Sequence, residues 1–219
     1  FGRNAYDFVD FLASCKQHYW QILPLTTTSY GDSPYQSFSA RAGNPNFIDF
    51  AELIEAGYLE QRDIDGVYLG SDPSNVDYGA IFGGRRQILD RAAERFAADK
   101  PADFDDFIRA NEDWLIPYCE FMTVKEECGL KAFWEWPAEL RTRGEASAKV
   151  CADHPARMLY HQMTQYFFDR QWSRLKAYAN ERDILIIGDL PIYVSRDSVE
   201  MWATPELFKI DAAGNPVSV

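Results

Sequence analysis

Residues 184–192 read Ile-Leu-Ile-Ile-Gly-Asp-Leu-Pro-Ile, and their pattern indicates the type of fold. Its first four residues are apolar without alternation, which is typical of a strand covered on both faces in a parallel sheet. A second apolar run of strand length, Tyr19–Leu25, also has a proline near its end. Because proline cannot donate to a central ladder, each proline marks the end of its strand. We therefore expect parallel strands that deliver polar loops to one shared edge of the sheet.

Helical patterns lie between and around these strands. Apolar spacing predicts a helix over 85–98, a further helix from Asp103, and a new helix beginning at Pro117, since proline is tolerated in a first helical turn. Asp153 and Pro155 open a long amphipathic helix. Asp197 begins a D-x-x-E capping signature before a short helix.

The order of helix, strand, helical stretch, helix and strand is that of an α/β protein. We assign residues 1–49 to the first part of one domain and residues 50–150 to a mainly helical insertion. Residues 151–219 then continue the first domain.

The segment Tyr30–Pro45 follows the first strand directly, so it is placed at the carboxyl edge of the sheet. It offers tyrosines, a carboxylate, hydroxyls and an amide, the mixture of rings and polar groups that a neutral polyol needs. A structural loop that packs on itself explains the same composition equally well.

Asp189 is a charge placed just beyond a buried strand, where it needs a partner or a functional role. Gly188 before it lets the backbone come close to a neighbour or a ligand. The alternative interpretation of Asp189 is a structural ion pair.

Composition limits the classes of partner. The chain of 219 residues has a net charge of −12 and a sequence pI of about 4.7, so it repels phosphate backbones and anionic lipid. We expect neither nucleic acid nor membrane as a partner. The 4 cysteines form no C-x-x-C pair and the 3 histidines show no metal-ligand spacing. These patterns favour reduced thiols, a cytoplasmic location and the absence of a metal site.

Three segments carry a specific resemblance: Tyr19–Pro45, Trp136–Arg141 and Ile184–Trp202. They resemble the 4-α-glucanotransferases, the amylomaltase or disproportionating branch of the α-amylase-like barrels (glycoside hydrolase family 77). The resemblance implies a partial TIM (β/α)8 barrel with a mainly helical insertion between early barrel strands. It also implies maltooligosaccharides and other α-glucans as partners and no cofactor.

The resemblance also implies roles for individual residues. Ser33 and Tyr35 match positions that contact the donor sugar, and Asp189 matches a carboxylate that holds substrate. Tyr30 and Tyr78 match positions that support a second glucan contact on the surface. Trp136 and Arg141 match a family pattern, and for them we favour packing over binding.

The reaction implied is a retaining double displacement, in which an Asp attacks the anomeric carbon and a Glu serves as acid and then base. In the family these carboxylates lie further along the sequence, so we assign no catalytic residue here. We expect this chain to be an inactive N-terminal portion of such an enzyme. An α-glucan hydrolase of the same barrel class and a non-catalytic glucan-binding module remain as alternatives.

Overall fold

We describe the protein from a computed structural model that places residues 1–29, 31–72, 74–211, 215 and 217. The chain divides into two compact units. Unit 1 comprises Phe1–Leu23, Asn44–Phe104 and Met163–Leu190, and unit 2 comprises Pro24–Gly43, Asp105–Gln162 and Pro191–Val219. The domain boundaries expected from the sequence, at 49 and 150, divide a partial barrel from a helical insertion and stay a prediction.

Unit 1 contains the two strands. β1 (Tyr19–Gln21) and β2 (Leu185–Ile187) pair in parallel, with Trp20 opposite Ile186. Backbone bonds continue the ladder beyond both ends, from Leu185 N to His18 O and from Ile22 N to Ile187 O. The predicted parallel pairing, and with it the common edge for the two strand ends, is confirmed.

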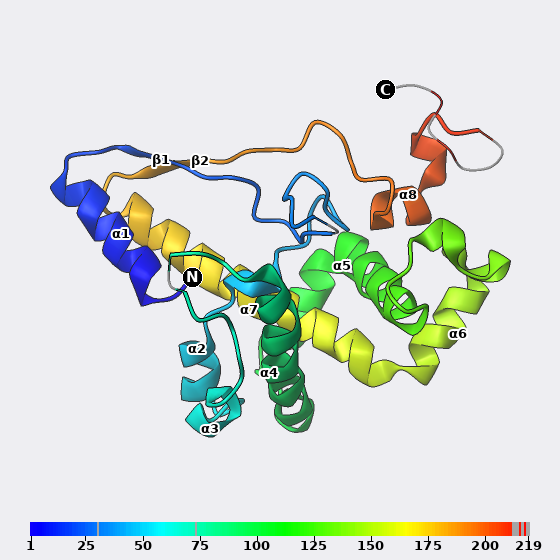
Figure 1. Ribbon diagram of the computed structural model, residues 1–219, viewed down its shortest axis with the longest axis horizontal. Helices are drawn as coiled ribbons and strands as arrows, with labels where there is room; N and C mark the ends of the chain where they lie inside the picture. The colour runs from blue at the N-terminus through cyan, green and yellow to red at the C-terminus, as the bar shows by residue number, and fades with distance from the viewer. Residues whose placement is uncertain (30, 73, 212–214, 216, 218–219) are drawn as a thin grey trace. The chain divides into compact units, whose positions relative to one another are not determined.

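Helices cover one face of this pair. α1 (Arg3–Ser14) and the part of α7 (Pro155–Asn180) from residue 163 onward lie along the strands (Figure 1). The buried residues of this layer are Val9, Leu175, Ala179 and Ile184, and the strand residues Trp20 and Ile186 pack against them.

The other face of the strands is open among the described residues. Leu185 and Ile187 are 55% and 46% exposed. The expectation that β2 is covered on both faces is therefore wrong for the chain as described. Successive side chains of a strand point to opposite faces, and helices pack on only one of them here. An α/β arrangement with a two-stranded parallel sheet is thus present.

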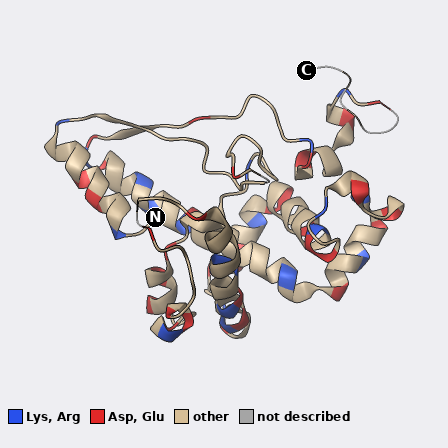
Figure 2. Cartoon of the chain, in the orientation of Figure 1, with Lys and Arg blue, Asp and Glu red and all other residues tan. Residues whose placement is uncertain are grey.

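The remaining elements of unit 1 are helical. They are η1 (Pro45–Phe47), α2 (Phe50–Glu55), α3 (Gln61–Ile64) and α4 (Tyr78–Ala98). α4 begins at Tyr78 instead of residue 85, because the Asp77 carboxylate accepts a hydrogen bond from Ala80 N at 2.9 Å and caps the helix. The sequence pattern did not predict residues 78–84 as helical, because they include glycines at positions 79, 83 and 84. Acidic and basic residues are interspersed along α4 (Figure 2).

Unit 2 is built on α5 (Phe104–Glu127), of which residues 105–127 belong to it. Around α5 lie η2 (Phe133–Glu135), η3 (Ala138–Leu140), α6 (Glu145–Asp153), the start of α7, α8 (Val199–Ala203) and η4 (Pro205–Leu207). Their main core consists of Phe121, Val124, Trp136, Leu140, Cys151, Val199 and Trp202.

Pro117 does not begin a helix, and this expectation is wrong. It lies inside α5, with Leu115 and Tyr118 buried on either side of it. A proline inside a helix removes one hydrogen bond at a cost of about 3 kcal/mol. Burial of these neighbouring apolar side chains offsets that cost.

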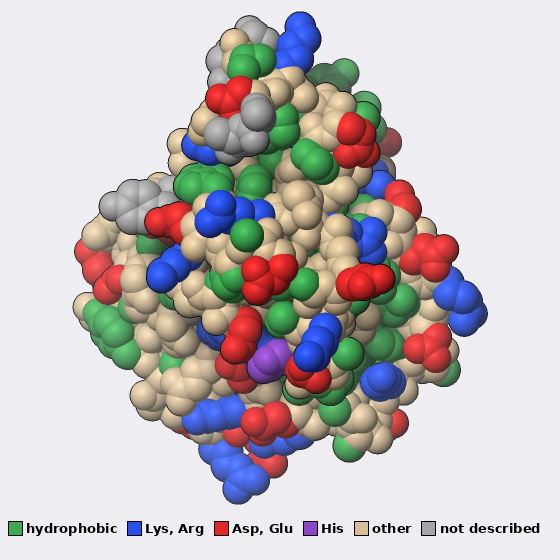
Figure 3. Space-filling view, turned by 90° about the vertical axis from the view of Figure 1, so that its right-hand side faces the viewer, with side chains coloured by type: hydrophobic (Ala, Val, Ile, Leu, Met, Phe, Trp, Pro, Cys, Tyr) green, Lys and Arg blue, Asp and Glu red, His purple; other side chains and the backbone are tan. Residues whose placement is uncertain are grey.

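Lys and Arg side chains are interspersed with Asp and Glu on the side where α6 and α8 lie (Figure 3).

Candidate functional site

The segment Pro24–Gly43, called the serine–tyrosine loop below, lies in unit 2 and is ordered by its own hydrogen bonds. Thr26 and Gly43 form an antiparallel bridge at its base. Further up, Ser29 N donates to Gln36 O at 3.0 Å, and Gln36 N donates to Ser33 O at 3.1 Å. These backbone hydrogen bonds fix the conformation of the loop although its described residues form no regular strand or helix.

Hydroxyl groups fill the inside of the loop. Ser37 Oγ donates to Ser39 O at 2.6 Å and lies 2.9 Å from Thr27 Oγ1. Both side chains belong to residues that are only 6% exposed. Buried hydroxyls with partners of this kind fix a loop in one conformation.

Ser33 and Tyr35, two of the predicted substrate residues, stand together at the tip. Tyr35 N donates to Ser33 Oγ at 3.3 Å, and the Tyr35 residue is 46% exposed. Tyr30, which was predicted on the same loop, lies outside the described residues. The tip therefore carries an exposed tyrosine and a serine hydroxyl two residues apart, a pair of groups that suits a sugar ring with its apolar face and polar edge.

A buried ion pair between Lys125 and Asp197 packs against the loop. Lys125 on α5 is 1% exposed, and its Nζ lies 2.6 Å from Asp197 Oδ2 and 2.9 Å from Lys131 O. The same ammonium lies 4.8 Å from the ring centroid of Phe38 in the loop. The pair thus joins α5, the segment before α8 and the serine–tyrosine loop within unit 2.

The prediction that Asp197 caps the short helix after it is wrong. Ser198, not Asp197, caps α8 through its side chain, which accepts from Met201 N. Asp197 turns instead to Lys125, and its other oxygen accepts from Phe133 N at 3.2 Å. A cap signature cannot show a pairing between residues 72 positions apart in the chain.

The loop and α8 also share a carboxylate. Glu200 Oε1 accepts from Ala40 N at 2.8 Å and from Ser39 Oγ at 3.2 Å. Val199 N donates to Phe38 O at 2.9 Å beside it. Sequence analysis did not find this role for Glu200; the capping signature was the only signal that touched it.

Asp189 lies in unit 1, directly after β2, and is half-buried. The parallel pairing of β1 and β2 places it at the edge where both strands end. Ser33 and Tyr35 belong to the other unit, so a pocket shared by these three residues stays a prediction.

Tyr78 opens α4 in unit 1 and is 50% exposed. Phe82, one turn later on the same helix, is 59% exposed. Residues four apart lie on one helix face, so the two rings present an aromatic surface. Sequence analysis named Tyr78 but not Phe82.

Trp136 belongs to the core, and Arg141 is an exposed residue whose side chain bonds to it. Trp136 is 1% exposed and its Nε1 donates to Lys131 O at 2.9 Å. Its ring packs 5.5 Å from that of Phe121. Arg141 Nε donates to Trp136 O at 2.8 Å, which supports the packing interpretation.

A further acid, Glu126 on α5, is largely buried against Arg157 and His161. Arg157 donates to both of its oxygens, at 2.7 and 3.2 Å, and His161 Nε2 lies 3.2 Å from Oε1. Burial raises the pKa of Glu126, but the hydrogen bonds and charges of His161 and Arg157 outweigh it and lower the pKa to about 2. An acid this strongly ionised cannot protonate a leaving group near neutral pH.

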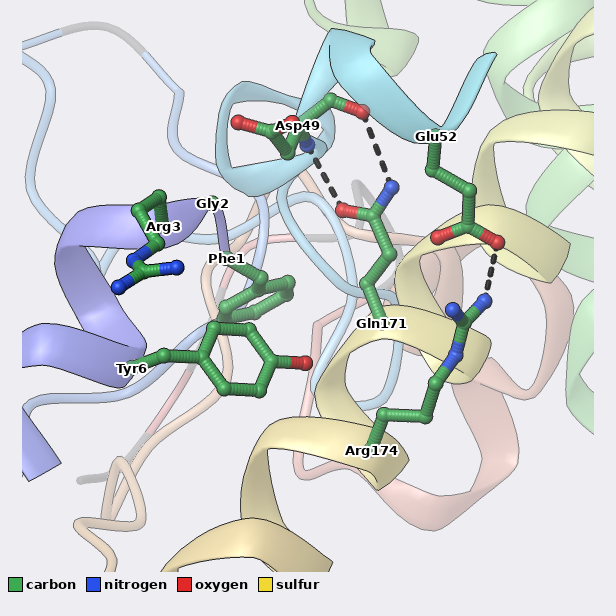
Figure 4. Close-up of a pocket in the computed structure, with 8 residues that line it drawn as sticks. All are labelled: Phe1, Gly2, Arg3, Tyr6, Asp49, Glu52, Gln171 and Arg174. Carbon is green, nitrogen blue, oxygen red and sulfur yellow. Dashed lines mark hydrogen bonds and ion pairs between the residues drawn. The ribbon is translucent and has the colours of Figure 1, made fainter. Parts of the chain in front are cut away.

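Unit 1 also has a cavity of about 260 Å³ between α1, α2 and α7 (Figure 4). Gln171 bonds both backbone groups of Asp49, and Arg174 pairs with Glu52. Its polar groups largely bond one another across the helix junction, and the cavity contains none of the predicted substrate residues. We interpret it as a structural junction.

Two further properties concern the described residues as a whole. None of their helices has the length and apolar character needed to cross a membrane. The described His, Cys, Asp and Glu side chains form no group of three or more placed to hold a metal ion.

Comparison with known proteins gives a consistent picture. A family model described as 4-alpha-glucanotransferase matches residues 1–216. A 4-alpha-glucanotransferase of Streptococcus pneumoniae is 50% identical over the whole chain, which spans 44% of that relative. One from Thermus thermophilus is 41% identical, again over the whole chain and 44% of the relative.

A solved structure, an amylomaltase from Streptococcus agalactiae in complex with acarbose, superposes with a TM-score of 0.93 at 48% identity. All of this chain and 45% of that one are covered. The chain therefore spans less than half the length of these relatives.

Proposed function

The chain belongs to the 4-alpha-glucanotransferase family, and on that premise we propose that it contributes to an enzyme that moves α-1,4-glucan segments onto glucose or another glucan. The observation that carries the proposal is the match over residues 1–216. The closed serine–tyrosine loop adds support, because it presents a ring and a hydroxyl suited to a neutral sugar.

The proposed substrate contacts are Ser33, Tyr35 and Asp189, with Tyr30 and Tyr78 at a second glucan site. Asp189 follows a strand that ends at the same edge as β1, which is where barrel enzymes hold substrate. Exposed Phe82 would extend the aromatic surface of Tyr78. We further propose that β1 and β2 are neighbours in a (β/α)8 barrel and that the enzyme works in the cytoplasm.

The proposed reaction is a retaining double displacement through a covalent glycosyl-enzyme. This requires a carboxylate nucleophile and a carboxylic acid about 5–5.5 Å apart. We place both in the part of the enzyme that this chain does not supply. The chain alone is then inactive, and its role is to bind and orient glucan.

The test is a fusion in which this chain replaces the matching 45% of the Streptococcus agalactiae amylomaltase. We expect the fusion to convert maltotriose into a ladder of longer oligosaccharides, while the chain alone gives no product. A fusion that releases mainly glucose and maltose favours the hydrolase alternative. A folded but inactive fusion that still binds glucan favours the non-catalytic module.

A further inference from the structure

Ser39 sits at the point where the serine–tyrosine loop meets α8, and its hydroxyl is fully used. Ser39 Oγ accepts from Arg41 N at 3.1 Å and from Ala42 N at 3.2 Å, and it donates to Glu200 Oε1. A hydroxyl has one proton and two lone pairs, so no capacity is left over. Ser39 is 1% exposed, which makes this bonding pattern costly to lose.

Glu200 brings a carboxylate to this arrangement. Its Oε1 takes two hydrogen bonds from the loop, at 2.8 and 3.2 Å. Bonds to an ionised acceptor are roughly twice as strong as those between neutral groups.

The second oxygen, Oε2, is buried and has no hydrogen-bond partner among the described residues. Burying a carboxylate oxygen without a hydrogen bond costs free energy. The two hydrogen bonds that Oε1 accepts from the loop must offset this cost.

The contacts of Glu200 lead step by step to the tip of the loop. Ser39 N and O both bond the Ser37 hydroxyl, at 3.2 and 2.6 Å. Gln36, the next residue, exchanges backbone bonds with Ser29 and Ser33. The Ser33 hydroxyl then accepts from Tyr35 N. The carboxylate on α8 is thus joined to the predicted sugar-contacting pair by hydrogen bonds and the short stretches of backbone between them.

We propose that Glu200 is a positioning residue for glucan binding, which holds the Ser33–Tyr35 tip in the orientation that meets the sugar by anchoring the loop at Ser39 and Ala40. The inference rests on the proposed function. Glu200 does not touch the glucan; it acts by restricting the loop before glucan arrives, so that less conformational freedom is lost on binding.

The test compares Glu200→Ala, Glu200→Gln and Ser39→Ala in the full chain. As a matched control we use Glu206→Ala, an exposed glutamate six positions further along. Hydrogen exchange is followed at the Ala40 and Ala42 amides, and affinity is measured by titration with acarbose. Thermal unfolding of each variant separates local loosening from loss of the fold.

We expect Glu200→Ala to speed amide exchange in residues 36–42 roughly tenfold and to weaken acarbose binding by roughly fivefold, with the fold retained and Tm lowered by a few degrees. Glu200→Gln keeps a carbonyl oxygen in place of Oε1, and because hydrogen bonds to a neutral acceptor are weaker, it should restore part of both values. Ser39→Ala should resemble Glu200→Ala, and combining the two should add little.

Unchanged exchange in Glu200→Ala, or no recovery in Glu200→Gln, overturns the inference. If Glu200→Ala does not fold, Glu200→Gln and Ser39→Ala decide by the same criteria. If the unchanged chain fails to bind acarbose, glucan binding by the isolated chain is refuted, and the exchange measurements still decide the role of Glu200.

Discussion

Replacing Lys125 by Met removes the ammonium from the buried pair with Asp197 and keeps most of the aliphatic volume. Lys125 is 1% exposed, while the Asp197 side chain is 18% exposed. After the change Asp197 retains the bond from Phe133 N but loses its counter-charge. Breaking a buried pair by removing one partner costs about 3–5 kcal/mol.

The partial exposure of Asp197 lets water take part of the lost role, so we expect a cost near the lower figure, about 3 kcal/mol. For a chain of this size 1 kcal/mol shifts Tm by about 2–4 °C, so Tm of Lys125→Met should fall by roughly 6–12 °C. The substitution also removes the ammonium that lies over the Phe38 ring, so the serine–tyrosine loop should become more mobile as well.

The assay is urea and thermal unfolding followed by circular dichroism, with Lys149→Met as the control. Lys149 lies exposed on α6 in the same unit, and its replacement should change stability by less than about 0.5 kcal/mol. Equal stability of the two variants would show that the Lys125–Asp197 pair does not stabilise the fold. The double variant Lys125→Met/Asp197→Asn should recover part of the loss, because no uncompensated charge remains.

Three further predictions follow from other contacts. The folded pKa of Glu126, about 2, lies below its ordinary value of 4.5, so its contribution to stability is present above pH 4.5 and is lost as pH falls towards 2. That contribution is on the order of 3 kcal/mol, and urea midpoints should fall between pH 5 and 3 in the unchanged chain but less in Glu126→Gln. Gly84→Ala should destabilise the chain by about 1–3 kcal/mol, because a Cβ there would lie 2.7 Å from Tyr68 O, whereas Gly83→Ala meets nothing within 4 Å and should stabilise α4 by about 0.5–1 kcal/mol in the same unfolding assay. Tyr35→Ala should weaken acarbose binding about tenfold in calorimetric titration without lowering Tm, since the ring is 46% exposed; unchanged affinity removes Tyr35 from the site.

The sequence predicted those parts of the fold whose signals are local. The parallel pairing of β1 and β2 follows from two short apolar runs that each end before a proline. The start of α7 at Pro155 follows from a proline suited to a first helical turn. The serine–tyrosine loop packs on itself through hydrogen bonds, which agrees with one of the two interpretations that its composition allowed.

The errors concern features that depend on distant contacts. The covering of β2 depends on how many elements pack against the sheet, which an apolar run does not report. The role of Asp197 depends on Lys125 in another helix, and that of Glu200 on a loop about 160 positions earlier. Sequence patterns are local, so anchors of this kind emerge only from the fold.

The most direct test of the whole account is a crystal structure of the fusion with acarbose bound. We predict one inhibitor molecule that contacts the Ser33–Tyr35 tip and the Asp189 carboxylate together. An acarbose molecule bound in the catalytic groove that touches neither the tip nor Asp189 would contradict the account.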